Sequence, residues 1–215
     1  MFSTIVFDFD GTLVDSNELK RAGFLQVAAQ HVGGMDCMSA VLDRVKGDRR
    51  AVFEAYAAAI EDTGSAEPRD VANLVAAYSN QVDAAVATAP EMPGATRALQ
   101  ELSQRGLSIH ISSATPLASL QRIVESRAWM PWVSGLFGSP GDKAETLRHL
   151  LQSRGLAPSA LAVVGDGADD RASAAAVGCP FFPVGEARGA TQPERVFTLP
   201  ELSIALSTVT KERVT

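Results

Sequence analysis

The sequence has few cysteines, no excess of positive charge and no long apolar run. Only Cys37 and Cys179 occur among the 215 residues, and their wide separation matches no metal-ligand spacing, so we expect buried, reduced thiols. The formal net charge of −6 argues against nucleic acid or an anionic membrane surface as a partner, because both attract basic patches. These two classes of partner are therefore not expected.

No apolar stretch approaches the roughly 20 residues that a membrane-spanning helix needs. The N-terminus has no basic region and Asp8 interrupts its apolar run, so a signal peptide is not expected and we predict a cytoplasmic location. The remaining composition, 46% hydrophobic and 20% charged, is ordinary for a globular chain. A chain of this length can bury a sizeable core.

Short β-branched and aromatic runs alternate with helical patterns along much of the chain. Residues 4–9 are typical of a buried strand, and similar runs follow at 107–112, 133–137, 161–165 and 179–184. Between them, helical patterns run into three glycines, the residue that best adopts the left-handed conformation at a helix end: Gly106, Gly155 and Gly178. Thr115-Pro116 indicates another helix start. The alternation predicts a doubly wound, Rossmann-like α/β core with a parallel sheet.

Residues 17 to 90 break this alternation. They contain helical patterns, for example at 18–31, 51–62 and 71–86, and no convincing strand. We therefore predict an all-helical domain at 17–90, inserted into an α/β core domain that is formed by 1–16 and 91–215.

Acidic residues stand at the carboxyl ends of two predicted strands, the edge where open α/β sheets gather their ligands. Asp8 and Asp10 are two residues apart, so on a strand both would point to the same side, and Asp166 follows the strand at 161–165. Converging carboxylates repel unless a cation or a shared proton relieves them, and oxygen ligands suit Mg²⁺. Gly11 would let the backbone turn closely around an anion. The alternative for this motif is an acidic strand end followed by a turn.

Three further positions have both a functional and a structural interpretation. Ser112 ends a predicted strand and could donate its hydroxyl to a phosphate oxygen, although serine is common there. Lys143 lies near a helix start, where the helix dipole does not favour it, and the alternative is a solvated lysine. Asp169 and Asp170 could simply cap the helix that follows them.

In this order, FDFDGTLVDS, ISS, the lysine of GDKAE and VGDGADD resemble the four motifs of the haloacid dehalogenase superfamily of phosphohydrolases. The resemblance covers nearly the whole chain, and the helical insertion matches the family's helical cap in position and size. Phosphoglycolate phosphatase and β-phosphoglucomutase are among the similar members. The resemblance implies an Mg²⁺-dependent phosphatase, a monomer or small homo-oligomer, acting on a small phosphorylated metabolite such as a sugar phosphate or phosphoglycolate.

The resemblance also implies a role for each motif residue. Asp8 would be the nucleophile, and Asp10 would protonate the leaving group and then deprotonate the attacking water. The metal would be held by Asp8, the backbone carbonyl of Asp10 and Asp166, with Asp170 in support through water or Lys143. The phosphoryl oxygens would be bound by Gly11, Thr12, Ser112, Ser113 and Lys143.

Several alternatives remain open at this point. Dehalogenases typically lack the second acid of the first motif, which is present as Asp10. Phosphosugar mutases often have Val at the position of Thr12 and Glu-Asp at that of Gly165-Asp166, so both departures favour a phosphatase. A non-catalytic binding protein on the same fold is the alternative of a different class. Asp169 stands where members often have Asn, so its role is left open.

The cap is expected to select the substrate. Residues 46–50 (KGDRR) look like the cap loop that places an arginine near the substrate in sugar-phosphate-acting relatives. Arg50 aligns best, Arg49 is its neighbour, and Lys20 could also face the cleft. The alternative for all three is a solvated surface position. His110, within a predicted strand, is expected to pack rather than to catalyse.

Overall fold

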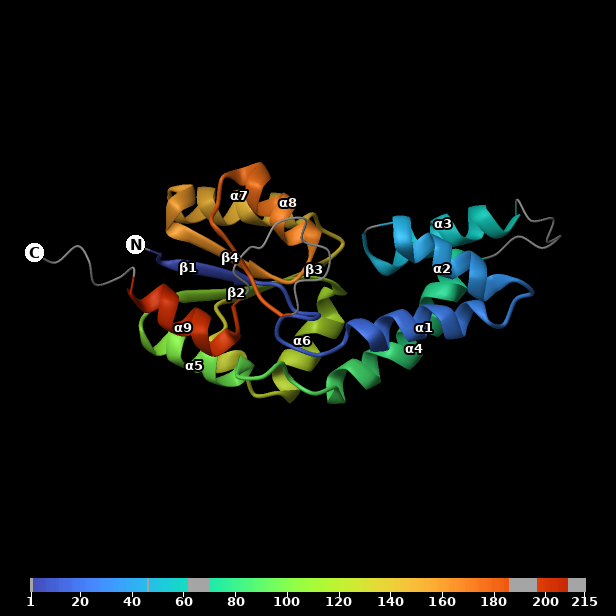
Figure 1. Cartoon of the computed structure of the whole chain (residues 1–215), viewed down its shortest axis with the longest axis horizontal. Coiled ribbons are helices and arrows are strands. Elements are labelled where there is room, and N and C mark those ends of the chain that lie inside the picture. Colours follow the sequence, from blue (N-terminus) through green and yellow to red (C-terminus); the bar gives the residue numbers. More distant parts are fainter. Residues whose placement is uncertain (1, 46, 62–69, 186–196, 209–215) are drawn as a thin grey trace, which may run out of the picture. The chain divides into compact units, whose positions relative to one another are not determined.

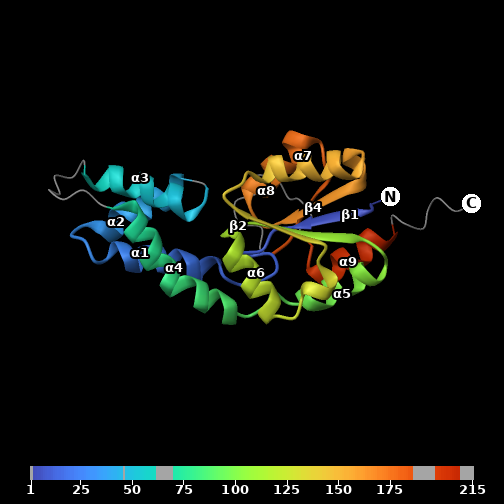
Figure 2. The same ribbon diagram turned by 180° about the vertical axis from the view of Figure 1, so that it is seen from behind.

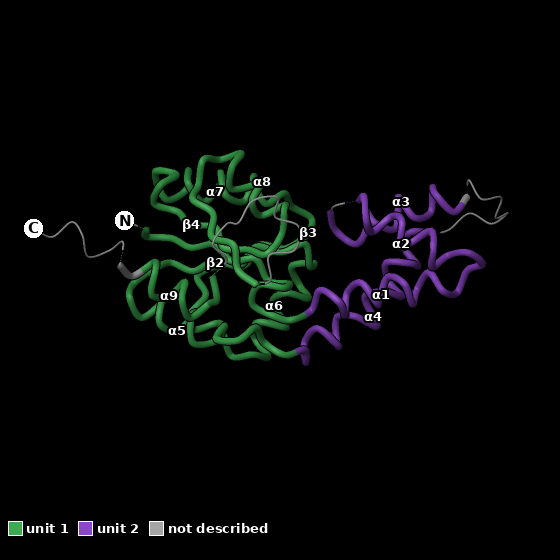
Figure 3. The backbone as a smooth tube through the Cα atoms, in the orientation of Figure 1, with its two compact units in different colours: residues 1–15, 90–215 green, residues 16–89 purple. Residues whose placement is uncertain are grey.

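The computed structural model describes residues 2–45, 47–61, 70–185 and 197–208. They divide into two compact units, which we call the first unit (1–15 and 90–215) and the second unit (16–89) (Figure 3). Lys46 of the predicted cap loop lies outside the described residues. Among the described helices none is long and apolar enough to cross a membrane. The assignment of the two units as catalytic core and cap stays a prediction.

The first unit is built on a five-stranded parallel sheet of order β3-β2-β1-β4-β5. Its strands are β1 (Thr4–Phe7), β2 (Ser108–Pro116), β3 (Gly135–Ser139), β4 (Leu161–Gly165) and β5 (Phe181–Pro183). The central strand β1 is buried along its whole length, as expected where helices cover both faces of a parallel sheet.

Helices lie on both faces of this sheet (Figures 1 and 2). One face carries α7 (Lys143–Arg154) and α8 (Ala168–Val177), and the other carries α5 (Ala95–Gln104), α6 (Leu117–Ser126) and α9 (Leu199–Thr208). Short 3-10 turns at Met130–Trp132 and Pro158–Ala160 precede β3 and β4. The chain leaves β1 toward one edge and later crosses back to β4, so the predicted doubly wound fold is confirmed.

The predicted ends of helices and strands agree with the structure to different degrees. Gly155 and Gly178 end α7 and α8 with φ values of 62° and 77°, the left-handed conformation expected of them. The helix predicted to start at Thr115-Pro116 is present but begins one residue later, because β2 continues through Pro116, which is the N-cap, and α6 begins at Leu117. The β2–β3 register shifts between Ser112 and Pro116, so pairing resumes after an irregular stretch.

The second unit consists, in its described residues, of four helices and no strand: α1 (Asn17–Ala28), α2 (Gly34–Arg44), α3 (Arg49–Glu61) and α4 (Val71–Thr88). Aromatic rings fill its core. Phe24 stacks on Tyr78 with ring centroids 4.1 Å apart, and Phe53 meets the same tyrosine edge-on at 5.8 Å. This helical unit is consistent with the predicted insertion between β1 and the rest of the sheet.

Candidate active site

The register of the central strands brings separate chain segments to one edge of the sheet. Phe7 of β1 pairs with Ile111 of β2 and with Val164 of β4. The next residues, Asp8 after β1 and Ser112 within β2, therefore lie side by side, and the Asp8 N–H donates to the Val164 carbonyl at 2.8 Å. Because the strands are parallel, this is the carboxyl edge, where open α/β sheets bind ligands.

A tight turn follows Asp8. Gly11 has a φ of 77°, which favours glycine over residues with a Cβ atom. Its N–H donates to the Val14 carbonyl at 2.8 Å within the turn. Phe9 is fully buried and anchors the turn in the core of the first unit. The turn thus presents Asp8 and Asp10 from a rigid base.

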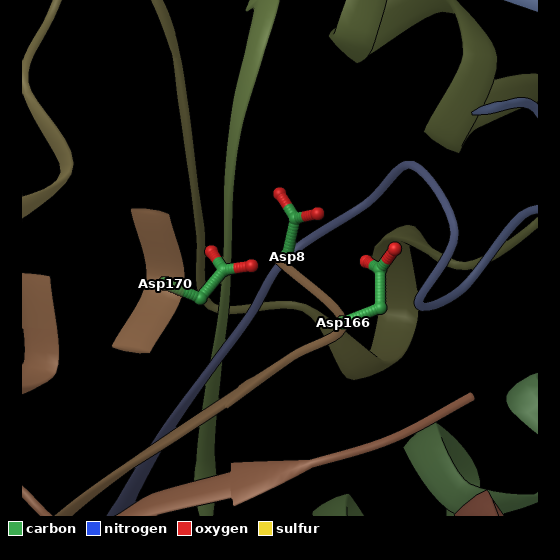
Figure 4. Close-up of side chains that lie close together, drawn as sticks. All are labelled: Asp8, Asp166 and Asp170. Atoms are coloured by element: carbon green, nitrogen blue, oxygen red, sulfur yellow. The ribbon is translucent and has the colours of Figure 1, made fainter. Parts of the chain in front are cut away.

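Three carboxyl groups from different segments gather at this edge: Asp8 after β1, Asp166 after β4 and Asp170 on α8 (Figure 4). One ligand atom from each lies within 4.8 Å of the others. Asp8 is 9% and Asp170 3% exposed, so water screens their repulsion poorly. Such a set of oxygen atoms is suited to a hard divalent cation such as Mg²⁺.

Lys143, the first residue of α7, reaches into this cluster. Its Nζ donates to Asp8 Oδ1 at 2.8 Å and to Asp170 Oδ1 at 2.6 Å. Burial lowers the pKa of Lys143, but the charges of Asp8 and Asp170 outweigh burial and raise it above its ordinary value, so the ammonium group stays charged. The carboxylates, and not the helix dipole, therefore hold this lysine at a helix start.

The charge of the cluster is not balanced by Lys143. Burial raises the pKa of Asp8 to about 7, Lys143 opposes this shift, and Asp170 and Asp10 add to it. Together with Asp166, one ammonium group faces four carboxyl groups. Negative charge therefore remains to be compensated when these groups are ionised.

Asp170 is held in place by the backbone on the side away from Lys143. Its Oδ2 accepts a hydrogen bond from the Gly167 N–H at 3.1 Å. A Cβ atom at Gly165 would lie 2.3 Å from the same oxygen, so only glycine leaves room for the carboxylate beside β4. This role of Gly165 was not predicted, because it depends on the close approach of α8.

Hydroxyl groups from the site bind carboxylates. Thr12 donates to Asp166 Oδ1 at 2.9 Å, and Ser113 donates to Asp10 Oδ2 at 3.1 Å. Both had been predicted to hold phosphoryl oxygens. Ser112, with the same prediction, is buried at the carboxyl edge.

Thr115 is a residue of the site that the sequence analysis missed. Its hydroxyl donates to Asp10 Oδ2 at 3.3 Å. Its position before Pro116 resembled a helix cap, and the signal that could have revealed it is the two-residue spacing from Ser113 on an extended strand.

The two arginines predicted to recognise substrate differ in their surroundings. Arg49 is 7% exposed, its Nη1 donates to Ser79 Oγ at 2.6 Å and pairs with Asp83 at 3.0 Å, and its guanidinium lies 5.0 Å from the centre of the Tyr78 ring. These contacts tie α3 to α4 and favour a structural role.

Arg50, in contrast, is an exposed residue of α3. Its side chain is 65% exposed and pairs with Glu54 at 2.9 Å, one helical turn away. Lys20 is half-buried on α1. Of the two arginines, Arg49 is thus the one whose ion pair is buried, whereas that of Arg50 is exposed.

Comparisons with known proteins address the fold and the family. The sequence pattern of the haloacid dehalogenase-like hydrolases matches residues 2–178. No protein of curated function matches the chain in sequence. Among solved structures, CbbY from Rhodobacter sphaeroides, determined in complex with phosphate, superposes with a TM-score of 0.72 at 16% identity, over 94% of this chain and 96% of that one.

Two further structures show a similar likeness. A protein predicted to be a phosphoglycolate phosphatase, from Haemophilus somnus, has a TM-score of 0.68 at 18% identity, over 85% of each chain. A Thermotoga maritima protein with a provisional assignment as β-phosphoglucomutase has a TM-score of 0.69 at 15% identity, over 97% of this chain and 100% of that one. At such identities the likeness is one of fold.

Proposed function

Because the chain belongs to the haloacid dehalogenase-like hydrolases, we propose that it is a Mg²⁺-dependent phosphatase that hydrolyses a small phosphomonoester through an aspartyl-phosphate at Asp8. The observation that carries this proposal is the position of Asp8. Asp8 directly follows the central strand, and its carboxylate contacts the Lys143 ammonium at 2.8 Å and lies beside Asp166 and Asp170. A phosphoryl group bound there would contact both the proposed nucleophile, Asp8, and the positive charge of Lys143.

In the first step, an oxygen of Asp8 attacks the phosphorus atom. The bond between phosphorus and the leaving alkoxide breaks, the electron pair stays on the leaving oxygen, and Asp10 supplies the proton that makes it an alcohol. Lys143 and Ser112 would bind the phosphoryl oxygens as charge shifts toward the leaving group.

In the second step, Asp10 has become a carboxylate and takes a proton from water. The water oxygen attacks phosphorus, and the bond to the Asp8 oxygen breaks, which releases inorganic phosphate and restores the Asp8 carboxylate. Asp10 is then protonated again and ready for the next substrate.

The residues present fit magnesium. The donor atoms are all oxygens, and the cluster keeps excess negative charge after Lys143 is counted. Asp8, Asp166 and the backbone carbonyl of Asp10 would hold the ion, with Asp170 in support. When bound, it would neutralise charge on the phosphoryl group.

A panel of about a hundred phosphorylated metabolites, assayed for phosphate release with and without Mg²⁺, tests this proposal. We expect release that stops with excess chelator and is lost in Asp8→Asn, because an amide is a poor nucleophile. Asp70→Asn is the matched control: Asp70 caps α4 in the second unit, and asparagine caps a helix equally well. Undiminished turnover in chelator, or in Asp8→Asn, would contradict the proposal.

Sugar phosphates and phosphoglycolate are the substrates we propose to test first. The fold likeness to CbbY and to the Haemophilus somnus protein predicted to be a phosphoglycolate phosphatase supports this choice. Arg50 is the proposed contact to the non-reacting part of the substrate, since its side chain is exposed whereas its neighbour Arg49 is buried in a pair with Asp83. Arg50→Ala should then lower kcat/KM for the true substrate about tenfold to a hundredfold and leave 4-nitrophenyl phosphate unaffected. Equal effects on both would contradict this role.

A phosphosugar mutase is the second candidate, and the fold likeness to the Thermotoga maritima protein is what favours it. The two functions differ in product: a mutase returns an isomeric sugar phosphate, whereas a phosphatase releases inorganic phosphate. Measuring both products in the same reaction separates them.

A further inference from the structure

Two buried hydroxyl groups at the end of β2 converge on one oxygen of Asp10. Because β2 continues past Ser112 to Pro116, Ser113 and Thr115 are two residues apart on extended chain and point to the same side. Ser113 donates to Asp10 Oδ2 at 3.1 Å and Thr115 donates to the same atom at 3.3 Å. The two contacts come from a strand that neighbours the one preceding Asp10.

A third hydrogen bond orients the Ser113 hydroxyl group. The Thr115 N–H donates to Ser113 Oγ at 3.0 Å, which leaves the single hydroxyl hydrogen of Ser113 for Asp10. Ser113 is 6% and Thr115 2% exposed, and hydroxyl groups so deeply buried are stable only when hydrogen-bonded. The β-branched side chain of Thr115 also has few rotamers. Ser113 and Thr115 therefore form a rigid support for Oδ2 of Asp10.

We propose that Thr115, together with Ser113, is a positioning residue that holds the Asp10 carboxylate in the orientation needed for proton transfer. This inference rests on the proposed function, in which Asp10 transfers a proton in both steps. Both hydroxyl groups donate to Oδ2, which restricts rotation of the Asp10 carboxylate, the group that transfers the proton in both steps. A misplacement of about 1 Å at such a position costs roughly a hundredfold in rate.

The first test compares Thr115→Val with Thr115→Ser, using 4-nitrophenyl phosphate and Mg²⁺. Valine keeps the branched shape without the hydroxyl, and serine keeps the hydroxyl without the methyl group. We expect Thr115→Val to lower kcat about tenfold to a hundredfold with KM nearly unchanged, and Thr115→Ser to restore most of the loss. Thr4→Val is the matched control, because Thr4 is 1% exposed at the opposite end of β1.

The second test asks whether the effect passes through Asp10. In an Asp10→Asn background, Thr115→Val should cause no further loss, since residues that act through one group are not additive. Ser113→Ala provides a second variant with the same expectation, should Thr115→Val fail to fold. Acid-quenched samples of the single variants should also contain more phosphoenzyme than wild type, because breakdown of the aspartyl-phosphate needs a correctly placed base.

The outcomes separate this inference from the proposed function. An active wild type with Thr115→Val and Ser113→Ala equally active would overturn the inference alone. So would a Thr115→Ser variant as slow as Thr115→Val, or full additivity with Asp10→Asn. A wild type that releases no phosphate from any substrate, with Mg²⁺ present, would overturn the proposed function and this inference with it.

Discussion

Both units of the molecule bury charged side chains, but they compensate the charge differently. In the second unit, Arg49 pairs with Asp83 at 3.0 Å, so one positive charge balances one negative charge. In the first unit, Lys143 pairs with both Asp8 and Asp170, and further acids lie beside them. The pair in the second unit is electrically neutral, whereas the cluster in the first unit keeps excess negative charge.

This difference distinguishes charges that hold helices together from charges that are typical of a reaction site. A balanced buried pair connects two helices and needs nothing else, although replacing it by apolar residues is often neutral for stability. An unbalanced cluster costs stability, and such a cost is typical of sites that bind a cation or a reacting group. Replacing Lys143 in the first unit should therefore reduce activity, whereas replacing Arg49 in the second unit should reduce stability.

The largest effect is expected for Lys143→Met. This change leaves the phosphoryl oxygens without their ammonium partner, so kcat/KM should fall about a thousandfold or more. Phosphate release from 4-nitrophenyl phosphate measures it. If Lys143→Met keeps more than a tenth of wild-type activity, the lysine is not part of the reaction site.

Arg49→Met should damage stability instead. It removes the guanidinium group that pairs with Asp83, and we expect the free energy of unfolding to fall by about 3 kcal/mol. The double variant Arg49→Met/Asp83→Leu should recover most of this loss. The exposed neighbour Arg50 is the control, since Arg50→Ala removes only a surface pair worth about 0.5 kcal/mol. Chemical denaturation measures all three, and equal effects at 49 and 50 would contradict the comparison.

His110 extends the comparison to a buried titratable group whose neighbour, Arg154, carries the same sign of charge as a protonated histidine. Burial lowers its pKa from 6.5 to about 4, and the Arg154 charge adds to this shift; Arg154 Nη1 lies 3.0 Å from His110 Nε2. Below pH 6.5 the unfolded chain binds a proton that the folded chain does not, so stability is lost as the pH falls toward 4.

This loss should reach about 3 kcal/mol by pH 4. His110→Gln keeps a polar side chain for Arg154 without titrating, so its unfolding free energy should fall less over this range. Denaturant titrations at several pH values measure the difference, and parallel curves for both proteins would contradict it.

The smallest effect is expected from magnesium itself. A ligand that binds only the folded state at a hundred times its Kd stabilises it by about 2.7 kcal/mol. The metal should therefore raise the unfolding free energy of the wild type, and Asp166→Asn should reduce this gain while Asp70→Asn keeps it. A gain of the same size in Asp166→Asn would place the ion elsewhere.

The fold was largely predictable because its signals are local. Short apolar strands, helical spacing and a glycine such as Gly155 at a helix end are all read from neighbouring residues. The strand ends of a parallel sheet share one edge, so the gathering of Asp8 and Asp166 could also be predicted.

The missed features depend on segments distant in sequence. Whether Arg49 or Arg50 is buried is decided by Ser79 and Asp83 on α4, about thirty residues away. Thr115 resembled a helix cap because Pro116 often begins a helix, and only the resumed pairing with β3 shows that it is strand. Such residues are identified by tertiary contacts, and spacing alone does not reveal them.

The central claim is that Asp8 carries the phosphoryl group. The most direct measurement is to react the chain with radiolabelled 4-nitrophenyl phosphate and Mg²⁺, quench with acid and locate the label by peptide analysis. Asp10→Asn should accumulate label on the peptide that contains Asp8, because this leaving group needs little protonation while the second step lacks its base. Asp8→Asn should carry none. Label that persists in Asp8→Asn, or that lies on another peptide, would contradict the account.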